Sequence, residues 1–459
     1  MLHELITPDI CELLDEGNLD EVREILDSWL PADLAGIVNS MPADKRPRLI
    51  EALNPHVAAQ TFAYLDPTLQ ETLVHQLHEP IVGAIVNEMT PDDRTRLLEY
   101  VAPEVRHLLL SLLQPEHFKV AQSLLDYAEG TIGRLMTPQV MAIRKDWTVR
   151  HVLDHVRAHG RDSETLNVLY VVDETNKLLD DIRIREFLLA PLEKHVSDLM
   201  DDRCIALRAA DKKQGAIEVF KKYDRIALPV VDAGDHLLGV VTVDDVLDVA
   251  EQRSTAEIQK FGGLEALDEP YVATPLLAMV KKRATWLVIL FVGEMLTATA
   301  MGYFEGEIAA APVLALFMPL IISSGGNSGS QAATLIVRAL AIGEMTLGGW
   351  WMVMRREFLS GSILGLILGT IGILRIALWS LFSDVYGPHW FLVALTVGLS
   401  LVGIVLWGSL SGSMLPFVLK RLGIDPATSS APFVATMVDV TGLIIYFSVA
   451  FMVLRGTLL

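Results

Sequence analysis

Residues 431–454 read APFVATMVDVTGLIIYFSVAFMVL, and this stretch decides the class of fold. It holds one charged side chain, Asp439, and a helix of this length spans the ~30 Å hydrocarbon core of a bilayer. Four apolar stretches of similar length precede it, at 284–303, 311–336, 358–382 and 390–417. The sequence therefore predicts a transmembrane domain with five helices over residues 281–459.

Charge is distributed unevenly along the chain. Residues 281–459 hold 10 Lys or Arg and 8 Asp or Glu, so residues 1–280 carry −22 of a total net charge of −20. Basic residues lie before the first stretch and after the second and fourth, whereas the loops 304–310 and 383–389 have none. Because cytoplasmic loops are rich in Lys and Arg, we expect a multi-pass protein of the cell (inner) membrane, with its N-terminal region cytoplasmic and its C-terminus outside. Such an acidic protein is expected to contact lipid but no nucleic acid.

Prolines punctuate the first 130 residues at intervals of 11 to 13, at positions 31, 42, 55, 67, 80, 91, 103 and 115. Asp66 and Thr90 directly precede Pro67 and Pro91, and this combination starts helices. The pattern predicts an all-α, acidic helical-repeat N domain over residues 1–130. Two interpretations stay open: a plain scaffold, or a scaffold that presents acids such as Asp92 and Asp93 to a neighbouring region.

Residues 131–250 contain two copies of a β-α-β-β-α pattern, at 136–192 and 200–250. This α/β region resembles a tandem pair of CBS domains, which sense small ligands. The second copy keeps the motif GVVTVDD over 239–245, whereas the first has Asp180, Arg183 and Glu186 at the corresponding positions. The resemblance implies adenine-nucleotide binding, for example of ATP, at the second copy only, through Thr242 and Asp245.

Residues 251–280 are predicted to form a connecting (plug) helix toward the membrane region. Ile258, Leu264 and Leu267 give it an apolar stripe, and Gly262-Gly263 predicts a break. A mechanical link and a passive linker are both consistent with this pattern.

Within the second membrane stretch, Pro319 is followed by the polar run SSGGNSGSQ over 323–331. We expect this run to interrupt the helix and to free backbone carbonyls for a hydrated cation, since irregular backbone at membrane depth survives only where it is buried in protein or lines water. The residues expected to line such a path are Pro319, Gly325, Gly326, Asn327 and Gln331. The alternative is a packing interface of small residues.

Asp439 lies eight residues into its helix, about 12 Å from the helix start. A carboxylate at this depth costs about 2.5–3.5 kcal/mol on insertion scales, so something must compensate it. Mg²⁺ prefers a few carboxylates together with retained water, which fits a site shared across a two-fold axis. The alternative is a carboxylate bonded to a nearby hydroxyl such as that of Thr441. The other two intramembrane charges, Glu294 and Arg375, are expected to pair or to reach an interface.

The order of these parts resembles that of the MgtE family of magnesium channels, as do the segments RATWL at 283–287, GGNSGSQ at 325–331, MLP at 414–416 and DVTG at 439–442. The resemblance implies a homodimer with its pore on the two-fold axis, Mg²⁺ at Asp439, and Ala435 and Thr436 in the pore lining. It also implies a brake in which cytosolic Mg²⁺ binds Asp224, Asp245, Asp248 and Glu257, with Asp92 and Asp93 nearby. Arg253, Ala256 and Ala431 depart from the family pattern, which predicts a weakened brake.

Two alternatives remain: a secondary carrier of other divalent cations such as Co²⁺ or Mn²⁺, and a membrane-tethered nucleotide receptor. Five spans do not divide into two equal halves, which disfavours the carrier. The sequence has no nucleophile–base pair and no GxxxxGK[ST] loop, so we expect no enzyme activity.

Overall fold

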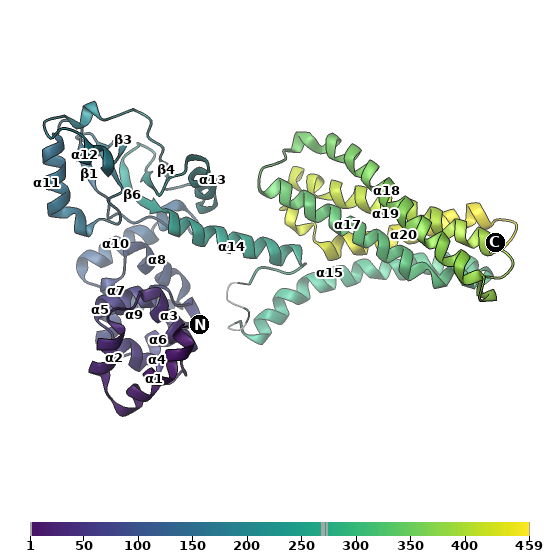
Figure 1. Ribbon diagram of the computed structural model, residues 1–459, viewed down its shortest axis with the longest axis horizontal. Coiled ribbons are helices and arrows are strands. Elements are labelled where there is room, and N and C mark those ends of the chain that lie inside the picture. Colours follow the sequence, from purple (N-terminus) through teal and green to yellow (C-terminus); the bar gives the residue numbers. More distant parts are fainter. Residues whose placement is uncertain (1, 268–270, 272–273, 459) are drawn as a thin grey trace. The chain divides into compact units, whose positions relative to one another are not determined.

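The computed structural model describes residues 2–267, 271 and 274–458 (Figure 1). The chain divides into two compact units, Met1–Arg253 and Ser254–Leu459.

The first half of unit 1 is a stack of ten short helices, seen in purple to blue in Figure 1. Their bounds are α1 Leu2–Glu16, α2 Leu19–Leu26, α3 Pro31–Ser40, α4 Arg46–Ala52, α5 Pro55–Ala63, α6 Pro67–Gln76, α7 Glu79–Glu88, α8 Pro91–Tyr100, α9 Pro103–Leu112 and α10 Pro115–Leu125. Odd-numbered helices pack on odd-numbered ones from α1 to α9, and even-numbered on even-numbered from α2 to α10. This two-layer stack, called the solenoid from here on, confirms the predicted helical repeat.

Proline stands at the first or second position of helices α3 to α10, because its missing N–H and fixed φ suit the start of a helix. Pro42 is the exception to the prediction, since it lies in the loop before α4. The residues directly before these helices do not cap them as expected. Asp66 and Thr90 stand at the N-cap positions, but neither side chain accepts a hydrogen bond from the helix. Instead, Thr90 Oγ1 donates to the Asp93 carboxylate at 3.0 Å.

The second half of unit 1 holds two three-stranded sheets of the same topology. In each copy the first strand is parallel to the second, and the second antiparallel to the third. The first copy comprises β1 Ala142–Arg144, α11 Val149–His159, β2 Val168–Val172, β3 Leu178–Arg183 and α12 Ile184–Leu189; the second comprises β4 Leu207–Arg208, α13 Lys213–Tyr223, β5 Ala227–Val231, β6 Leu237–Thr242 and α14 Val243–Phe261. A shared apolar cluster that includes Tyr170 and Val240 joins the copies.

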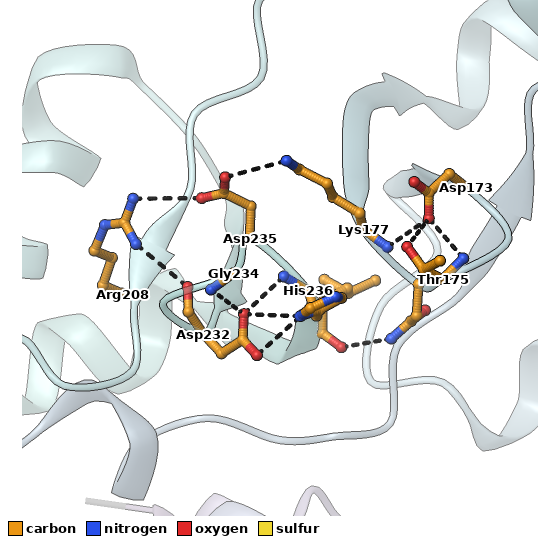
Figure 2. Close-up of polar contacts among 10 residues, drawn as sticks. Asp173, Thr175, Lys177, Arg208, Asp232, Gly234, Asp235 and His236 are labelled. Atoms are coloured by element: carbon orange, nitrogen blue, oxygen red, sulfur yellow. Dashed lines mark hydrogen bonds and ion pairs between the residues drawn. The ribbon is translucent and has the colours of Figure 1, made fainter.

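The two hairpin turns repeat the same hydrogen bonds, as Figure 2 shows. The Asp173 carboxylate accepts the backbone N–H groups of Thr175 and Lys177, and the Asp232 carboxylate accepts those of Gly234 and His236. The hydrogen bond from the Thr175 hydroxyl, together with those from the N–H groups, lowers the pKa of Asp173, and the hydrogen bonds from His236 and Gly234 lower the pKa of Asp232. The repetition supports the reading of the two copies as one duplicated module.

The predicted connecting helix over 251–280 is only partly right. Helix α14 runs without interruption from Val243 to Phe261, so this helix is the continuation of the second CBS-like copy. It ends at Gly262-Gly263, where Gly263 has φ 75°. Residues 268–270 and 272–273 of the predicted helix lie outside the described residues, and the next helix begins at Leu276.

Unit 2 is helical. Its helices are α15 Leu276–Tyr303, α16 Glu305–Ala310, α17 Met318–Ala341, α18 Trp350–Ser380, α19 Trp390–Arg421 and α20 Ala431–Leu454. In the described part of the chain, four segments are long and apolar enough to cross a membrane: α15, Leu347–Ser380 (which contains α18), α19 and α20. Helix α17 is not among them, since the run 323–331 is polar; the fifth span remains a prediction.

Small residues set the packing of this unit. A Cβ on Gly408 would overlap the carbonyl oxygen of Gly325, and one on Gly412 would overlap that of Gly329, so α17 and α19 touch backbone to backbone. At Gly365, α18 also lies close to the backbone of α19, at Val402. Close contact between these helices leaves α17 fixed against α19 and α20, and this arrangement positions the site.

Candidate ion pathway and cytosolic acidic cluster

A hollow within unit 2 contains most of the predicted pore-lining residues. It is lined by Met301, Ala315, Met318, Pro319, Ile322, Ser323, Gly326, Asn327, Ala435 and Asp439. The Asp439 carboxylate is its one acidic group. Asn327 and Ser323, on α17, add an amide and a hydroxyl on the facing side. The hollow thus offers the oxygen ligands that a hydrated divalent cation prefers.

Asp439 has no structural partner. Within residues 274–458 its carboxylate makes no hydrogen bond and no ion pair. The Thr441 hydroxyl, which could have satisfied it, donates to the carbonyl of Met437 at 2.9 Å and accepts from Trp407 Nε1 at 2.8 Å. The carboxylate therefore faces the hollow without compensation from the described residues.

The expected interruption of the second membrane helix is wrong. Helix α17 is continuous from Met318 to Ala341, and only a short 3-10 turn over Pro312–Leu316 precedes it. The polar run instead contributes residues to two faces of α17, one packed against other helices and one facing the hollow. Gly325, Ser328 and Gly329 are buried in helix packing, where Ser328 Oγ lies 2.7 Å from Ser409 Oγ. Gly326 and Asn327 face the hollow. Side-chain oxygens, and not freed carbonyls, are therefore what α17 presents.

Three predicted pore residues do not line this hollow. Gly325 is packed against Ile404 and Val438. Gln331 is exposed and absent from the lining. Thr436 lines a second hollow against α15.

Unit 1 contains an acidic cluster, which we define as Asp92, Asp93, Glu164, Asp244, Asp245 and Asp248. Four of its members, Asp92, Asp93, Asp245 and Asp248, line one hollow between α8 and α14. The solenoid therefore does present acids to its neighbour, which the sequence left open. In the described residues no group of three or more such side chains forms a ready metal site.

Arg96 lies within this cluster. Its Nη2 is 2.6 Å from Asp93 Oδ1 and its Nη1 is 2.7 Å from Asp248 Oδ2. Nη2 also donates to the carbonyl of Ala63 at 3.2 Å. Sequence reasoning missed this residue, although its place three residues after Asp93 was a usable signal. Its guanidinium supplies a fixed positive charge between two carboxylates.

The remaining carboxylates of the cluster are electrostatically crowded. Burial and the nearby Asp92 raise the pKa of Asp245 to about 8. Burial together with Asp92, Asp244 and Asp93 raises the pKa of Glu164 to about 7. Asp92 Oδ1 is buried and has no hydrogen-bond partner among the described residues. Negative charge therefore exceeds what Arg96 compensates. Glu164 carried no sequence signal, because only the fold brings its segment to α8. Asp244 belongs to the motif GVVTVDD over 239–245 but was not singled out.

Two other predicted sensor residues, Asp224 and Glu257, do not line this hollow. Asp224 is exposed at the C-terminus of α13, with φ 48°, and does not line the hollow. Glu257 lies further along α14, in unit 2. Asp245 also accepts the Thr242 hydroxyl at 2.9 Å, so the two residues expected to hold a nucleotide bond to each other at the start of α14.

In the first CBS-like copy, a carboxylate of the chain itself occupies the position compared with the nucleotide site of the second copy. Asp180 is fully buried, and its carboxylate accepts the backbone N–H groups of Asp181, Asp201 and Asp202 at 2.9, 2.8 and 3.2 Å. A site that already holds a carboxylate is a poor place for a phosphate. Nucleotide binding at the second copy alone stays a prediction.

The fold and the two sites define a multi-pass membrane protein that combines a carboxylate among apolar helices with a duplicated α/β module and an acidic cluster. Comparison with known proteins gives the family. Residues 318–449 match the family model described as MgtE, divalent cation transporter; residues 29–130 match the MgtE intracellular N domain; residues 132–193 and 196–251 each match the CBS domain.

Full-length relatives agree. The chain is 35% identical to the magnesium transporter MgtE of Thermus thermophilus over 99% of its own length and 100% of that protein. It is 30% identical to a magnesium transporter MgtE of Enterococcus faecalis over 73% of this chain and 71% of that protein. The chain belongs to the MgtE family, as the sequence motifs indicated.

Two solved structures resemble the cytosolic part. One is the cytosolic domain of the Mg²⁺ channel MgtE in complex with ATP, which is 31% identical, has a TM-score of 0.51, and covers 53% of this chain and 99% of that one. The other is the soluble part of a magnesium transporter, which is 26% identical, has a TM-score of 0.52, and covers 55% of this chain and 99% of that one.

Proposed function

We propose that this protein is a Mg²⁺ channel that admits Mg²⁺ to the cytosol and senses cytosolic Mg²⁺ through its acidic cluster. The observation that carries the proposal is the uncompensated Asp439 carboxylate in the hollow between α17 and α20. A divalent ion satisfies that carboxylate, and Asn327 and Ser323 are placed to bond the water it retains. The magnesium transporters among the relatives favour this function over a carrier of other cations or a nucleotide receptor.

The membrane potential is the proposed driving force. A divalent ion that crosses an inside-negative potential of 100 mV gains about 4.6 kcal/mol, so no coupled ion is needed. We propose that the pore forms on the two-fold axis of a homodimer in the inner membrane, with the C-terminus outside. The basic residues Lys281, Arg338 and Lys420, at the ends that this orientation makes cytoplasmic, support it.

The acidic cluster is the proposed sensor. Crowded carboxylates repel one another until a cation neutralises them, so Mg²⁺ binding favours the state in which α8 stays against α14. Asp92, Asp93, Asp245 and Asp248 are the proposed ligands, with Asp224 and Glu257 as outlying members. Arg96 already supplies part of the neutralising charge. Mg²⁺ therefore has less to contribute here, and we propose a weakened brake.

ATP is the proposed ligand of the second CBS-like copy. The similar cytosolic domain in complex with ATP supports this assignment, as does the carboxylate that fills the first copy. A nucleotide phosphate close to Asp245 requires that carboxyl group to be protonated or to share a cation. ATP binding is therefore expected to strengthen when Mg²⁺ is present.

Uptake of Mg²⁺ into proteoliposomes that contain the full chain tests the function. Uptake recorded with a trapped Mg²⁺-sensitive dye should rise as the inside-negative potential, set by a K⁺ gradient and valinomycin, is increased. It should need no gradient of H⁺ or Na⁺. Uptake that vanishes without such a gradient would instead indicate a carrier.

A further inference from the structure

Glu294 is an intramembrane carboxylate that the pathway described above does not use. It lies eleven residues after Arg283 on α15, about 16 Å beyond the last basic residue at the start of that helix. Among the described residues it makes no hydrogen bond and no ion pair. Its insertion cost of about 2.5–3.5 kcal/mol therefore lacks a visible compensation.

The two structural roles expected for Glu294 are not realised. Arg375 does not pair with it, because its guanidinium stacks over the Trp379 ring at 4.1 Å from the ring centroid. A glutamate side chain reaches only about 5 Å, so it cannot extend from this depth to the interface as Lys or Arg can. Glu294 must meet either lipid or a hydrated path.

The register of α15 against α20 fixes the depth of Glu294. Trp286 Nε1 donates to Ser430 Oγ at 3.2 Å, which aligns the two helices near their starts. Further along, a methyl group on Gly293 would lie 3.1 Å from Thr436 Cγ2. Seven residues on α15 therefore match six on α20, and the helices run parallel. Glu294 is level with about residue 437, so Asp439 lies roughly 3 Å further along the axis.

Glu294 also faces the same side of α20 as Asp439. It lines a hollow in which Thr436 is the other polar residue, together with Ala284, Leu287, Val288, Leu290 and Phe291. Thr436 precedes Asp439 by three residues, and residues at this spacing are neighbours on a helix surface. The two carboxylates thus flank Thr436 from adjacent hollows at one level of the membrane.

We propose that Glu294 is a second charged residue of the ion pathway, which acts with Asp439 on one hydrated divalent cation. This inference rests on the proposed function. In a homodimer it gives the site four carboxylates. Such a site holds Mg²⁺ more tightly and excludes monovalent cations more strongly than two carboxylates would. Glu294 is thereby a determinant of affinity and of charge selectivity.

Concentration-dependent Mg²⁺ uptake by the full chain in proteoliposomes tests the proposal, with Mg²⁺ itself as the probe. Glu294→Gln removes the charge and keeps the shape, and it should raise the half-saturating Mg²⁺ concentration roughly 5- to 10-fold. Glu294→Asp keeps the charge, and its half-saturating Mg²⁺ concentration should lie between those of the unmodified protein and Glu294→Gln. Glu305→Gln, the same change at the start of α16, is the matched control and should match the unmodified protein.

The outcomes separate this inference from the proposed function. Unchanged half-saturation in Glu294→Gln, while Asp439→Asn abolishes uptake, overturns the role of Glu294 alone. A lower maximal rate of Glu294→Gln with unchanged half-saturation also overturns it, since that pattern reports a structural role. Normal uptake by Asp439→Asn would instead defeat the proposed function. A rise in Na⁺ uptake by Glu294→Gln would support the selectivity half of the proposal.

Discussion

Arg96 Nη1 lies 2.7 Å from Asp248 Oδ2, which joins the solenoid helix α8 to helix α14 of the second CBS-like copy. The same guanidinium holds Asp93 at 2.6 Å. This bridge does not need an ion, so part of the contact that a sensed cation would stabilise is built into the chain. The remaining acids of the cluster still repel one another, so Mg²⁺ can still stabilise the contact. Because Arg96 already neutralises part of the charge, that stabilisation is smaller.

Removal of the bridge should make the contact depend on Mg²⁺. Arg96 and Asp248 are partly exposed, so Arg96→Ala should weaken the contact between α8 and α14 by about 1 kcal/mol or less. The population in which these helices are separated should rise up to about fivefold. Proteolysis of the full chain in detergent should therefore accelerate without Mg²⁺ and slow again when Mg²⁺ is added. The unmodified protein should respond less to Mg²⁺.

Arg150→Ala is the control for this experiment. It breaks a comparable exposed pair, Arg150 with Glu193 at 3.0 Å, away from the acidic cluster. Its cleavage should match that of the unmodified protein. Equal Mg²⁺ responses of the unmodified protein and Arg96→Ala would contradict the role of the bridge.

The raised carboxyl pKa values predict the direction of pH dependence. Asp245 titrates near pH 8 and Glu164 near pH 7 in the folded chain, well above their ordinary values of about 4. The folded state therefore binds more protons between about pH 4 and pH 8, so stability falls as pH rises through this range. Without Mg²⁺, the thermal midpoint of the cytosolic region should decrease from about pH 6 to pH 8.5.

Added Mg²⁺ and the variant Asp245→Asn should each change this pH dependence. Mg²⁺ competes with protons for the same oxygens, so it should restore the midpoint most at the alkaline end. Asp245→Asn should flatten the profile, because the amide has no charge to lose. A midpoint that rises with pH in the unmodified protein would show that the cluster is not crowded.

Close contact between α17 and α19 should be intolerant of a single methyl group. Gly408→Ala places a Cβ on the carbonyl oxygen of Gly325 and should destabilise the protein by roughly 1–3 kcal/mol. The same change at Gly302, where no atom lies within 4 Å of the added carbon, is the control. The thermal midpoint in detergent measures both; equal midpoints would refute this packing.

Much of the fold was predictable because its signals are local. Proline marks the start of helices α3 to α10, and long apolar runs form long helices whatever packs on them, so most of the solenoid and four apolar helices followed from the pattern alone. The polar run at 323–331 led to the wrong prediction of a helix break, because that prediction also used local signals alone. Glycine and serine weaken a helix locally, but packing of Gly325 and Gly329 on α19 keeps α17 continuous.

The sites were predictable only in part. Asp439 could be found from sequence because a lone carboxylate in an apolar helix is conspicuous. Glu164 and Arg96 could not be joined to Asp245 and Asp248, since their segments are far apart along the chain and meet only in the folded unit. The depth of Glu294 became clear only from the contact of Trp286 with Ser430.

Mg²⁺ current through Asp439→Asn tests the central claim most directly. Single-channel recordings of the purified full chain in a planar bilayer, with Mg²⁺ as the one permeant cation, should show conductance for the unmodified protein. The same conductance is expected for the loop control Asp384→Asn. Asp439→Asn, which keeps the shape and removes the charge, should lower the Mg²⁺ current at least about tenfold. An unaltered Mg²⁺ current in Asp439→Asn would contradict the account.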